Sequence, residues 1–334
     1  MDPIRITADS KLIKVLADQV QNKRVDSDAA QEATEIFHTL AQQENTGEVI
    51  RTIGQTVAYT MNDSHQNSLG FLESIADTKH CNFGEKIAFN MQTGGINAVI
   101  QAKGSTTPRS YVASRQLFID TIEVSSRPAI NIMELRCNRV NMPDLVRQAN
   151  EQMVLKETGY IEDVLHKAVA EFHSPFYGSA NGIDTTILDR QLEYFRRLGP
   201  VTIVGDIAAV SQMIGVQGMV GANGNGTVAY SDDQMNEYAS TGMLGKYKGS
   251  TVISMPNAYE TGKTTPIMKT NWLYLVPGNI SVDLHNLKIL YEGGVNSFEA
   301  QNINDLVYEI RLDQWFGAAF VTNKIPNIGA YKIN

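Results

Sequence analysis

Cysteine and long apolar runs are what this 334-residue sequence most lacks. Its two cysteines, Cys81 and Cys137, are too few and too far apart for a disulfide framework or a zinc site, so we expect two reduced thiols. No run of about 18 apolar residues is present that could cross a membrane. The first residues also lack the basic patch and apolar core of a secretory signal. These absences exclude a membrane span and a disulfide-stapled scaffold.

Basic charge is also in deficit. The 28 Lys and Arg residues are outnumbered by 36 Asp and Glu, which gives a formal net charge of −8. Proteins whose affinity comes from neutralising phosphates concentrate Lys and Arg, so the composition argues against a dedicated DNA reader. An acidic chain can still enclose nucleic acid without gripping it. The hydrophobic content of 43% is ample for a sizeable core.

Two amphipathic helices are predicted near the N-terminus. Residues 9–20 place Leu12, Leu16 and Val20 on one face, and residues 27–43 repeat the pattern after Ser27, a plausible N-cap. Neither segment has enough apolar surface to form a core alone. We therefore expect both to pack on something else.

Strand-like alternation begins near Phe83. Four segments rich in Ile, Val, Phe and Tyr are separated by turn residues: "KIAFNMQ", "INAVIQA", "SYVASRQLFIDTIEV" and "INIMELR". Residues 84–118 are expected to form a long two-stranded projection that turns near "KGSTTPR". An isolated hairpin is marginal in water, so this arm needs a partner surface.

A long helix is predicted after the strands. Pro143 suits a first helical position, and apolar residues recur at three- and four-residue spacing to Phe172, with a bend expected near Gly159. A second helix is predicted from an Asp184 N-cap to Gly199.

The C-terminal part is predicted to alternate strands and turns. "PVTIVGDIAAVSQMIG" predicts a strand and then a helix, with Asp206 as N-cap and Gly215 as its end. From Ser250 onward we expect mostly short strands: "TVISM", "WLYLV", "ISVDL", "KILYEGG", "LVYEIRL" and "GAAFV".

The segment Gly262-Lys263-Thr264 nearly matches a nucleotide-binding P-loop. Asn257 stands where the motif requires its first glycine. The motif also requires a helix directly after the Lys-Thr pair, so that backbone N–H groups meet the phosphates. Here "TTPIMKTNWLYLV" has the composition of a strand. The near-match is therefore interpreted as turn chemistry between two strands.

No other stretch carries a catalytic, cofactor or metal motif. "TIVGDIAAVSQMIG" has one glycine where a dinucleotide fingerprint needs three, and "GVQGMVGANGNG" follows a helix, which favours a surface loop. His166 and His173 lie one heptad apart near Glu171 but lack a third zinc ligand, so we expect solvated helix histidines. We predict no catalytic, cofactor-binding or metal-binding residue, and no enzyme.

The order of parts resembles the major capsid proteins of tailed bacteriophages, which have the Hong Kong 97-type shell fold. The resemblance covers Ser68 to Asn334 and rests on five stretches in sequence order: "LGFLESIADTKHCNFGEKIAF", "PVTIVGDIAAVSQMIG", "MNEYASTGMLGKYKGSTVISMPNAY", "LYLVPGN" and "YEIRLDQWFGAAFVTNKIPNIGAYKI". It implies an α+β fold with an N-terminal arm, an extended β-hairpin (the E-loop), a peripheral (P) domain with a long spine helix, and an α/β axial (A) domain.

The resemblance also implies a division of the chain. The expected parts are an N-terminal arm at 1–78, the E-loop at 79–120, the P domain with its spine helix at 121–183, most of the A domain at 184–286, returning P-domain strands at 287–317, and the last A-domain strands at 318–334.

The function implied is structural. Copies of the chain would self-assemble as hexamers and pentamers into an icosahedral phage head that encloses double-stranded DNA without sequence-specific binding. Portal, scaffolding and decoration proteins would be further partners, with assembly in the bacterial host cytoplasm and a final location in the virion. An encapsulin-like bacterial compartment and a P-loop or dinucleotide-binding enzyme stay open as alternatives.

Two basic residues are the candidates for an intersubunit contact. Lys103 and Arg109 flank the expected tip of the hairpin arm. If the arm lies across a neighbouring subunit, we expect these two cations to meet carboxylates of that neighbour.

Overall fold

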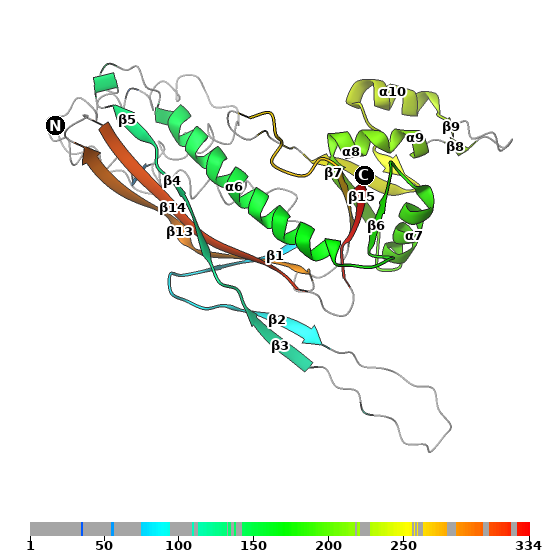
Figure 1. The fold of residues 1–334 in the computed structure, drawn as a ribbon, viewed down its shortest axis with the longest axis horizontal. Coiled ribbons are helices and arrows are strands. Elements are labelled where there is room, and N and C mark those ends of the chain that lie inside the picture. The colour runs from blue at the N-terminus through cyan, green and yellow to red at the C-terminus, as the bar shows by residue number, and fades with distance from the viewer. Residues whose placement is uncertain are drawn as a thin grey trace.

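The computed structural model has a long helix that lies along the first of two sheets and ends at the second, with a hairpin arm that projects from the first sheet (Figure 1). The two predicted N-terminal helices lie outside the described residues except for Glu35, which is helical, as are Gln55 and Thr56 further along the segment. The structure describes residues 35, 55–56, 75–93, 109, 113–131, 133–134, 137, 142–217, 219–220, 228–255, 257, 259, 263–278, 285–302, 307–321 and 326–334.

The first sheet has the order β1-β13-β14-β4, and β5 also pairs with β14. Strand β1 runs parallel to β13, and the other pairs are antiparallel. The strands are β1 (Ala76–Cys81), β4 (Ile122–Ser126), β5 (Ala129–Asn131), β13 (Leu287–Asn302) and β14 (Val307–Phe320).

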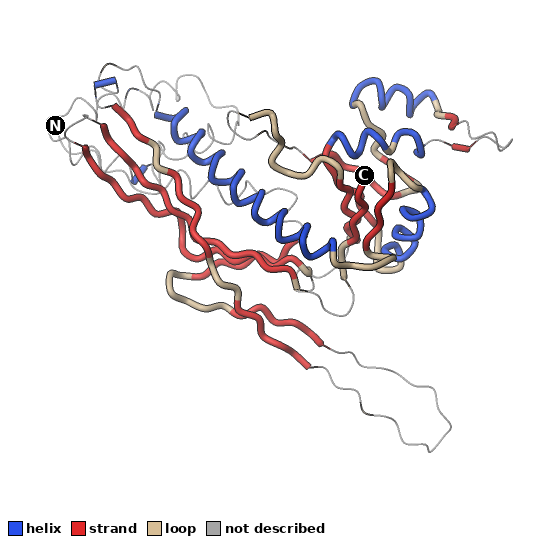
Figure 2. Tube along the Cα trace, in the orientation of Figure 1, coloured by secondary structure: helices blue, strands red, loops and turns tan. Residues whose placement is uncertain are grey.

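Strands β13 and β14 correct the prediction of short C-terminal strands. "KILYEGG" is only the start of the 16-residue β13, while "VYEIRL" and "GAAF" belong to one 14-residue strand (Figure 2). The polar stretch after Gly294 carries no apolar alternation, so its strand character was not recognised. Pairing with β14 supplies the backbone hydrogen bonds that hold it extended.

A second correction concerns "INIMELR". Strand β5 ends at Asn131, and Met133 and Glu134 are helical. The Oδ1 atom of Asn131 accepts the backbone N–H of Met133 at 2.9 Å. An N-cap side chain makes the same kind of bond. The bond therefore favours the start of a helix after Asn131 and not a continuation of the strand.

Helix α6 (Met142–Ala170) confirms the predicted spine. It begins one residue before Pro143 and ends two residues before Phe172. Its apolar spacing places five side chains in the interior: Ala149, Met153, Ile161, Leu165 and Val169. It runs as one helix through Gly159. The last three of these side chains belong to a cluster that includes residues of both sheets, so α6 is the element that joins them.

The second sheet has the order β10-β11-β7-β12-β15-β6. Central strand β7 pairs parallel with β11 and antiparallel with β12. The strands are β6 (Tyr177–Ala180), β7 (Val201–Asp206), β10 (Lys246–Tyr247), β11 (Ser250–Met255), β12 (Trp272–Pro277) and β15 (Gly329–Ile333). A separate small pair is formed by β8 (Met219–Val220) and β9 (Val228–Ala229).

Helices flank the second sheet at capped positions. As predicted, Asp184 caps α7 (Thr185–Arg196) and Asp206 caps α8 (Ile207–Gln212), each carboxylate accepting a backbone N–H at 2.8 Å. The predicted end at Gly215 is wrong, because α8 closes at Met213 and Gly215 lies inside the next helix. That helix is α9 (Ile214–Gln217), and α10 (Asp232–Thr241) follows after β9.

The predicted hairpin arm is present at its base. Strands β2 (Ala88–Thr93) and β3 (Ala113–Phe118) pair antiparallel over their full length and leave the body of the molecule together (Figure 1). The predicted strand "INAVIQA" and the tip lie outside the described residues, except for Arg109.

Candidate assembly interface

The arm is anchored to the first sheet by a small apolar cluster. Phe89 of β2 is fully buried against Cys81 of β1 and Leu290 of β13. Partly buried Ile87, Leu117 and Ile119 pack around these three. Burial of an aromatic side chain of this kind contributes roughly 1.5–3 kcal/mol. The base of the arm is therefore part of the folded subunit.

Charged groups surround the same aromatic ring. The ammonium of Lys79 lies 4.7 Å from the centroid of Phe89 and donates to the Ala88 carbonyl at 3.2 Å. The ammonium of Lys288 lies 5.8 Å from that centroid and forms a buried ion pair with Asp77 at 2.7 Å. A buried charge is tolerated because its partner is present, so each residue of this pair depends on the other.

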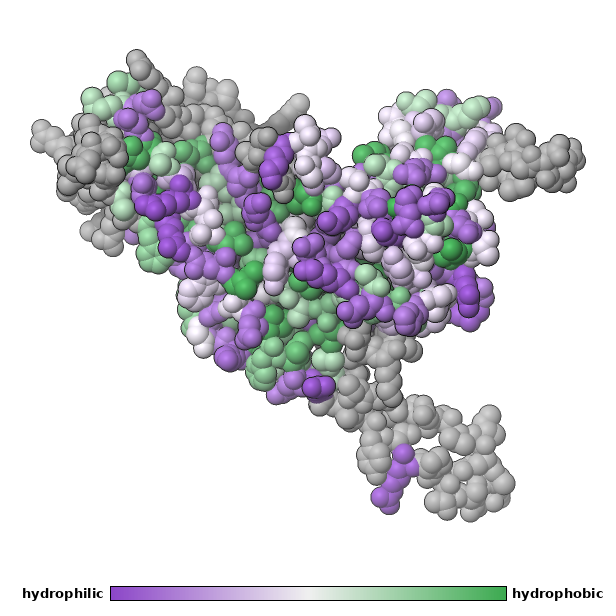
Figure 3. Space-filling view, viewed as in Figure 1, coloured by the Kyte–Doolittle hydropathy of each residue, from purple (hydrophilic) through white to green (hydrophobic). Residues whose placement is uncertain are grey.

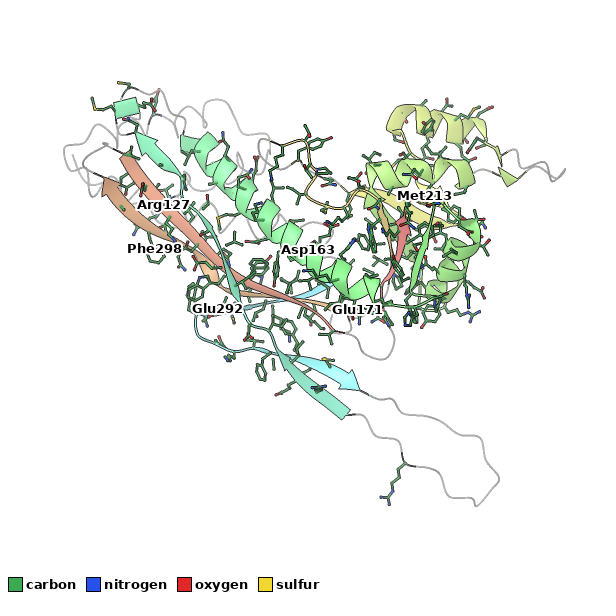
Figure 4. The ribbon with its side chains drawn as sticks, in the orientation of Figure 1. Arg127, Asp163, Glu171, Met213, Glu292 and Phe298 are labelled. Atoms are coloured by element: carbon green, nitrogen blue, oxygen red, sulfur yellow. The ribbon has the colours of Figure 1, made fainter. Side chains whose placement is uncertain are left out.

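Glu292 of β13 connects the two chain segments that enter and leave the arm (Figure 4). One carboxylate oxygen accepts the backbone N–H of Gly84 at 2.8 Å, and the other accepts the Thr121 hydroxyl at 2.6 Å. The Thr121 bond, and then the Gly84 bond, lower the pKa of Glu292 because both stabilise the charged form. We call this group of three residues the arm clasp.

Phe83 covers the backbone next to the arm clasp. Its ring lies over Gly293, where a Cβ atom would collide with the ring, and meets the edge of Trp315 with centroids 5.1 Å apart. Gly293 has φ +69°, in the left-handed region that glycine adopts without strain. The register between β13 and β14 shifts between Glu292 and Asn296, so regular pairing of the two strands is interrupted just after Glu292.

Large apolar side chains are exposed where the arm meets the body, and no pattern in the sequence marked them. Phe118 is 54% exposed, Phe83 46% and Trp315 37%. Hydrophobic surface gathers in this region of the visible face (Figure 3). Clustered exposed apolar side chains are typical of surfaces that another protein covers.

The far end of the first sheet has a mixed aromatic and charged surface. Phe298 is 60% exposed and pairs across the strands with Arg311, which forms an ion pair with Glu123 (Figure 4). Arg127 and Glu309 form another ion pair nearby on the sheet. Exposed pairs of this kind add little to subunit stability but can orient a partner.

The two predicted contact residues cannot be joined into one site. Arg109 is exposed, and Lys103 lies outside the described residues. Their contact with a neighbouring subunit stays a prediction.

The segment after Lys263 and Thr264 is not a helix. Within residues 263–278 the chain bends, forms a bridge from Pro266 to Tyr259, and enters β12 only at Trp272. A P-loop needs helical N–H groups here, so this geometry does not provide a phosphate cradle. The strand predicted at "WLYLV" is confirmed as β12. Before it, the Asn257 and Glu162 side chains accept the N–H groups of Met268 and Lys269.

Glu162 is a buried carboxylate at the junction of α6 and the second sheet. Its two oxygens accept the Lys269 N–H at 2.9 and 3.2 Å. Burial raises the pKa of Glu162 to about 7, although the Lys269 N–H and its charge act in the opposite direction. Burial and then the charge of Glu162 raise the pKa of the Tyr274 phenol well above its usual range. This group holds the junction together.

The histidine prediction is wrong for His166. Its ring packs on Trp272 with centroids 3.7 Å apart, and burial lowers its pKa. His173, one heptad on, is exposed as predicted but lies beyond the end of α6. Among the described residues no group of three or more His, Cys, Asp and Glu side chains could hold a metal ion. His166 is therefore a packing residue.

The cysteines behave as separate thiols. Both are free, Cys81 buried in the cluster under the arm and Cys137 exposed. Burial, followed by the charges of Glu292 and Glu85, raises the pKa of Cys81. Within the described part of the chain, no helix is long and apolar enough to cross a membrane.

Solved structures with a similar fold include the capsids of phages and of a GTA particle. The mature capsid of bacteriophage PhiM1 has 7% identity and a TM-score of 0.52, over 79% of this chain and 87% of that one. The capsid of an empty GTA particle has 14% identity and a TM-score of 0.51, over 80% and 90%. The capsid of cyanophage P-SCSP1u has 9% identity and a TM-score of 0.50, over 78% and 86%. At these identities the likeness shows the fold, which is the α+β Hong Kong 97-type shell fold.

The family of the protein is shown by a sequence match. Residues 6–332 match the family model described as "SPbeta prophage-derived putative capsid protein YonB". A search of curated proteins found no match. The encapsulin-like compartment and the nucleotide-binding enzyme are less supported by these findings. Because the match spans nearly the whole chain, the protein belongs to this prophage-derived capsid family and is a structural major capsid protein of a tailed-phage shell.

Proposed function

We propose that copies of this subunit form hexamers and pentamers that close an icosahedral head around double-stranded DNA. The observation that carries the proposal is the β2–β3 arm, which is anchored at its base and extends away from the core that stabilises the rest of the chain (Figure 1). A projecting hairpin is marginal by itself, so a neighbouring subunit is the natural surface for it. One contact repeated around a ring closes an assembly.

The enclosed DNA would be held without sequence-specific contacts. With 36 acidic and 28 basic residues, the chain lacks the excess of positive charge that gives phosphate-driven affinity. Portal, scaffolding and decoration proteins would be its other partners, and assembly would take place in the host cytoplasm. The subunit would have a structural role in the shell and would catalyse no reaction.

We also propose that the chain divides as the shell fold implies. The P domain would combine α6 with the first sheet, and the A domain would be the second sheet with α7 to α10. Sheet pairing favours two refinements: β6 at Tyr177–Ala180 joins the A-domain sheet before the predicted boundary at 184, and β14 stays in the P-domain sheet to Phe320.

Electron microscopy of the protein expressed alone tests the function. We expect rings or closed shells, because both sides of the proposed contact, the arm and the surface that it covers, are supplied by copies of the same chain. Purified particles should carry no bound nucleotide. A monodisperse monomer at all concentrations, with or without a co-expressed scaffolding protein of the same phage, would contradict the proposal.

A further inference from the structure

Two chain segments meet β13 where the arm begins. One is the turn at 82–87 that leads into β2, and the other is the short link at 119–121 that follows β3. Both line one small cavity together with Leu290 and Glu292. Any change in the direction of the arm must therefore pass through this point.

The turn on the incoming side is closed by its own hydrogen bonds. Glu85 donates its backbone N–H to the Asn82 carbonyl at 3.0 Å, and its carboxylate accepts from the Asn82 backbone and side chain at 3.2 Å. Gly84 at its apex has φ +78° and directs its N–H to Glu292. The hydrogen bond to Glu292 thus holds the turn as a unit.

The attachments of the arm are of two physical kinds. The Phe89 cluster is apolar, and apolar burial has no directional preference. The two hydrogen bonds of Glu292 are directional, and bonds to an ionised acceptor are the stronger type. The Phe89 cluster fixes where the arm is attached. The two hydrogen bonds of Glu292 are the contacts that can fix the angle of the arm relative to the first sheet.

The position of Glu292 is itself held from both sides. The register shift between β13 and β14 begins immediately after it, and the Phe83 ring lies over the backbone of Gly293. Trp315, the cross-strand neighbour of Glu292, supports the Phe83 ring. These contacts therefore fix the position of the Glu292 carboxylate that binds the two segments of the arm.

We propose that Glu292 is a latch that sets the angle of the hairpin arm relative to the first sheet. When its bonds to Gly84 and Thr121 are broken, the arm keeps its Phe89 anchor and pivots about it. The latch acts through the arm clasp, whose three residues are far apart in sequence, and its role is to position the arm. It acts in the free subunit, and only its effect on shell geometry rests on the proposed function.

Distances between spin labels in full-length subunits below the assembly concentration test the latch. One label replaces exposed Arg115 on β3 and the other exposed Lys167 on α6, in a Cys137→Ser background. We expect one narrow distance distribution in the parent protein. Glu292→Ala should broaden it at least twofold, and exchange of the Gly84 amide should accelerate at least tenfold.

The matched control is Glu309→Ala. Glu309 lies on the same sheet and pairs with Arg127, remote from the arm. This variant should keep the parent distribution, which separates the latch from a general loss of surface charge. Thr121→Val removes one of the two bonds and leaves Glu292 in place, so we expect intermediate broadening.

The result is decisive in either direction. Unchanged distributions in folded Glu292→Ala and Thr121→Val would overturn the latch. If Glu292→Ala does not fold by circular dichroism, Thr121→Val alone decides between the two outcomes. Because these measurements use free subunits, a failure to form shells would contradict the proposed function and leave the latch standing.

Discussion

At the scale of single residues, Glu162 links folding to pH. Its pKa is raised from an ordinary value of 4.5 to about 7, so the folded protein keeps a proton that the unfolded chain releases. The free energy of unfolding must then fall as pH rises from about 4.5 to about 7. His166, whose pKa is lowered, acts in the opposite sense below its ordinary value of 6.5.

Glu162→Gln should remove this pH dependence. Each pKa unit corresponds to about 1.4 kcal/mol, so the contribution is on the order of 3 kcal/mol. We expect the difference in unfolding free energy between variant and parent to change by that amount between pH 5 and pH 8, measured by urea denaturation. Asp163→Asn, an exposed neighbour on α6, is the control and should keep most of the parent slope. A constant difference for Glu162→Gln across this range would rule out the shifted carboxyl.

A second residue-scale prediction concerns Gly293. Gly293→Ala would add a Cβ inside the contact distance of the Phe83 ring and strain a left-handed backbone. Gly182→Ala is the matched control, because Gly182 has φ +79° and open space around it. We expect the control to lose roughly 1–2 kcal/mol and Gly293→Ala to lose at least 1 kcal/mol more. Equal melting temperatures for the two variants would mean that Phe83 moves aside freely.

At the scale of elements, helix α6 stabilises the subunit through its buried face. Leu165 is fully buried in the cluster that joins both sheets, whereas Val164 is half-buried. Leu165→Ala should cost about 2–5 kcal/mol and Val164→Ala distinctly less. Exposed Lys167→Ala, on the same helix, should stay within about 0.5 kcal/mol of the parent. The check is the melting temperature of free subunits, and parent-like melting of Leu165→Ala would contradict the packing.

The hairpin arm carries the prediction for assembly. Replacing Lys103 and Arg109 with Glu would place like charges against a neighbour's carboxylates, which can cost several kcal/mol. Sedimentation should show soluble subunits or small rings in place of shells, with unchanged circular dichroism, since the arm is anchored through Phe89 and not through its tip. Arg115→Glu, on the described part of β3, is the comparison for charge alone. Intact shells of normal stability would mean that the tip is not at an interface.

At the scale of the whole molecule, one apolar cluster extends through α6 into both sheets. It contains Val204 and Trp272 from the second sheet and Ile289 and Phe316 from the first. Domains that share a core in this way are expected to unfold together. The two parts should therefore behave as one cooperative unit, although the sheets are separate.

The two tryptophans allow that cooperativity to be measured, because Trp315 lies in the first sheet and Trp272 in the second. Trp315→Phe leaves a probe of the second sheet, and Trp272→Phe leaves a probe of the first. In each variant, the fluorescence midpoint in urea should coincide with the far-ultraviolet circular dichroism midpoint. Separate midpoints would show that the two sheets unfold independently.

Local patterns predicted the spine helix, the starts of α7 and α8 and the base of the arm. Apolar spacing from Leu145 to Val169 and the caps at Asp184 and Asp206 act over three or four residues, so they are legible in the sequence alone. The alternating strands around "KGSTTPR" indicated a hairpin for the same reason. The order of such parts was sufficient to identify the shell fold and its function.

Tertiary structure alone decided the features that depend on distant partners. Glu292 and Gly84 are 208 residues apart in sequence, and no local pattern could pair them. The polar second half of β13 is a strand because β14 supplies its hydrogen bonds, and His166 is half-buried because its ring packs on Trp272. Backbone pairing and side-chain burial depend on residues of neighbouring helices and strands that are distant in sequence. Only the folded chain brings these residues together.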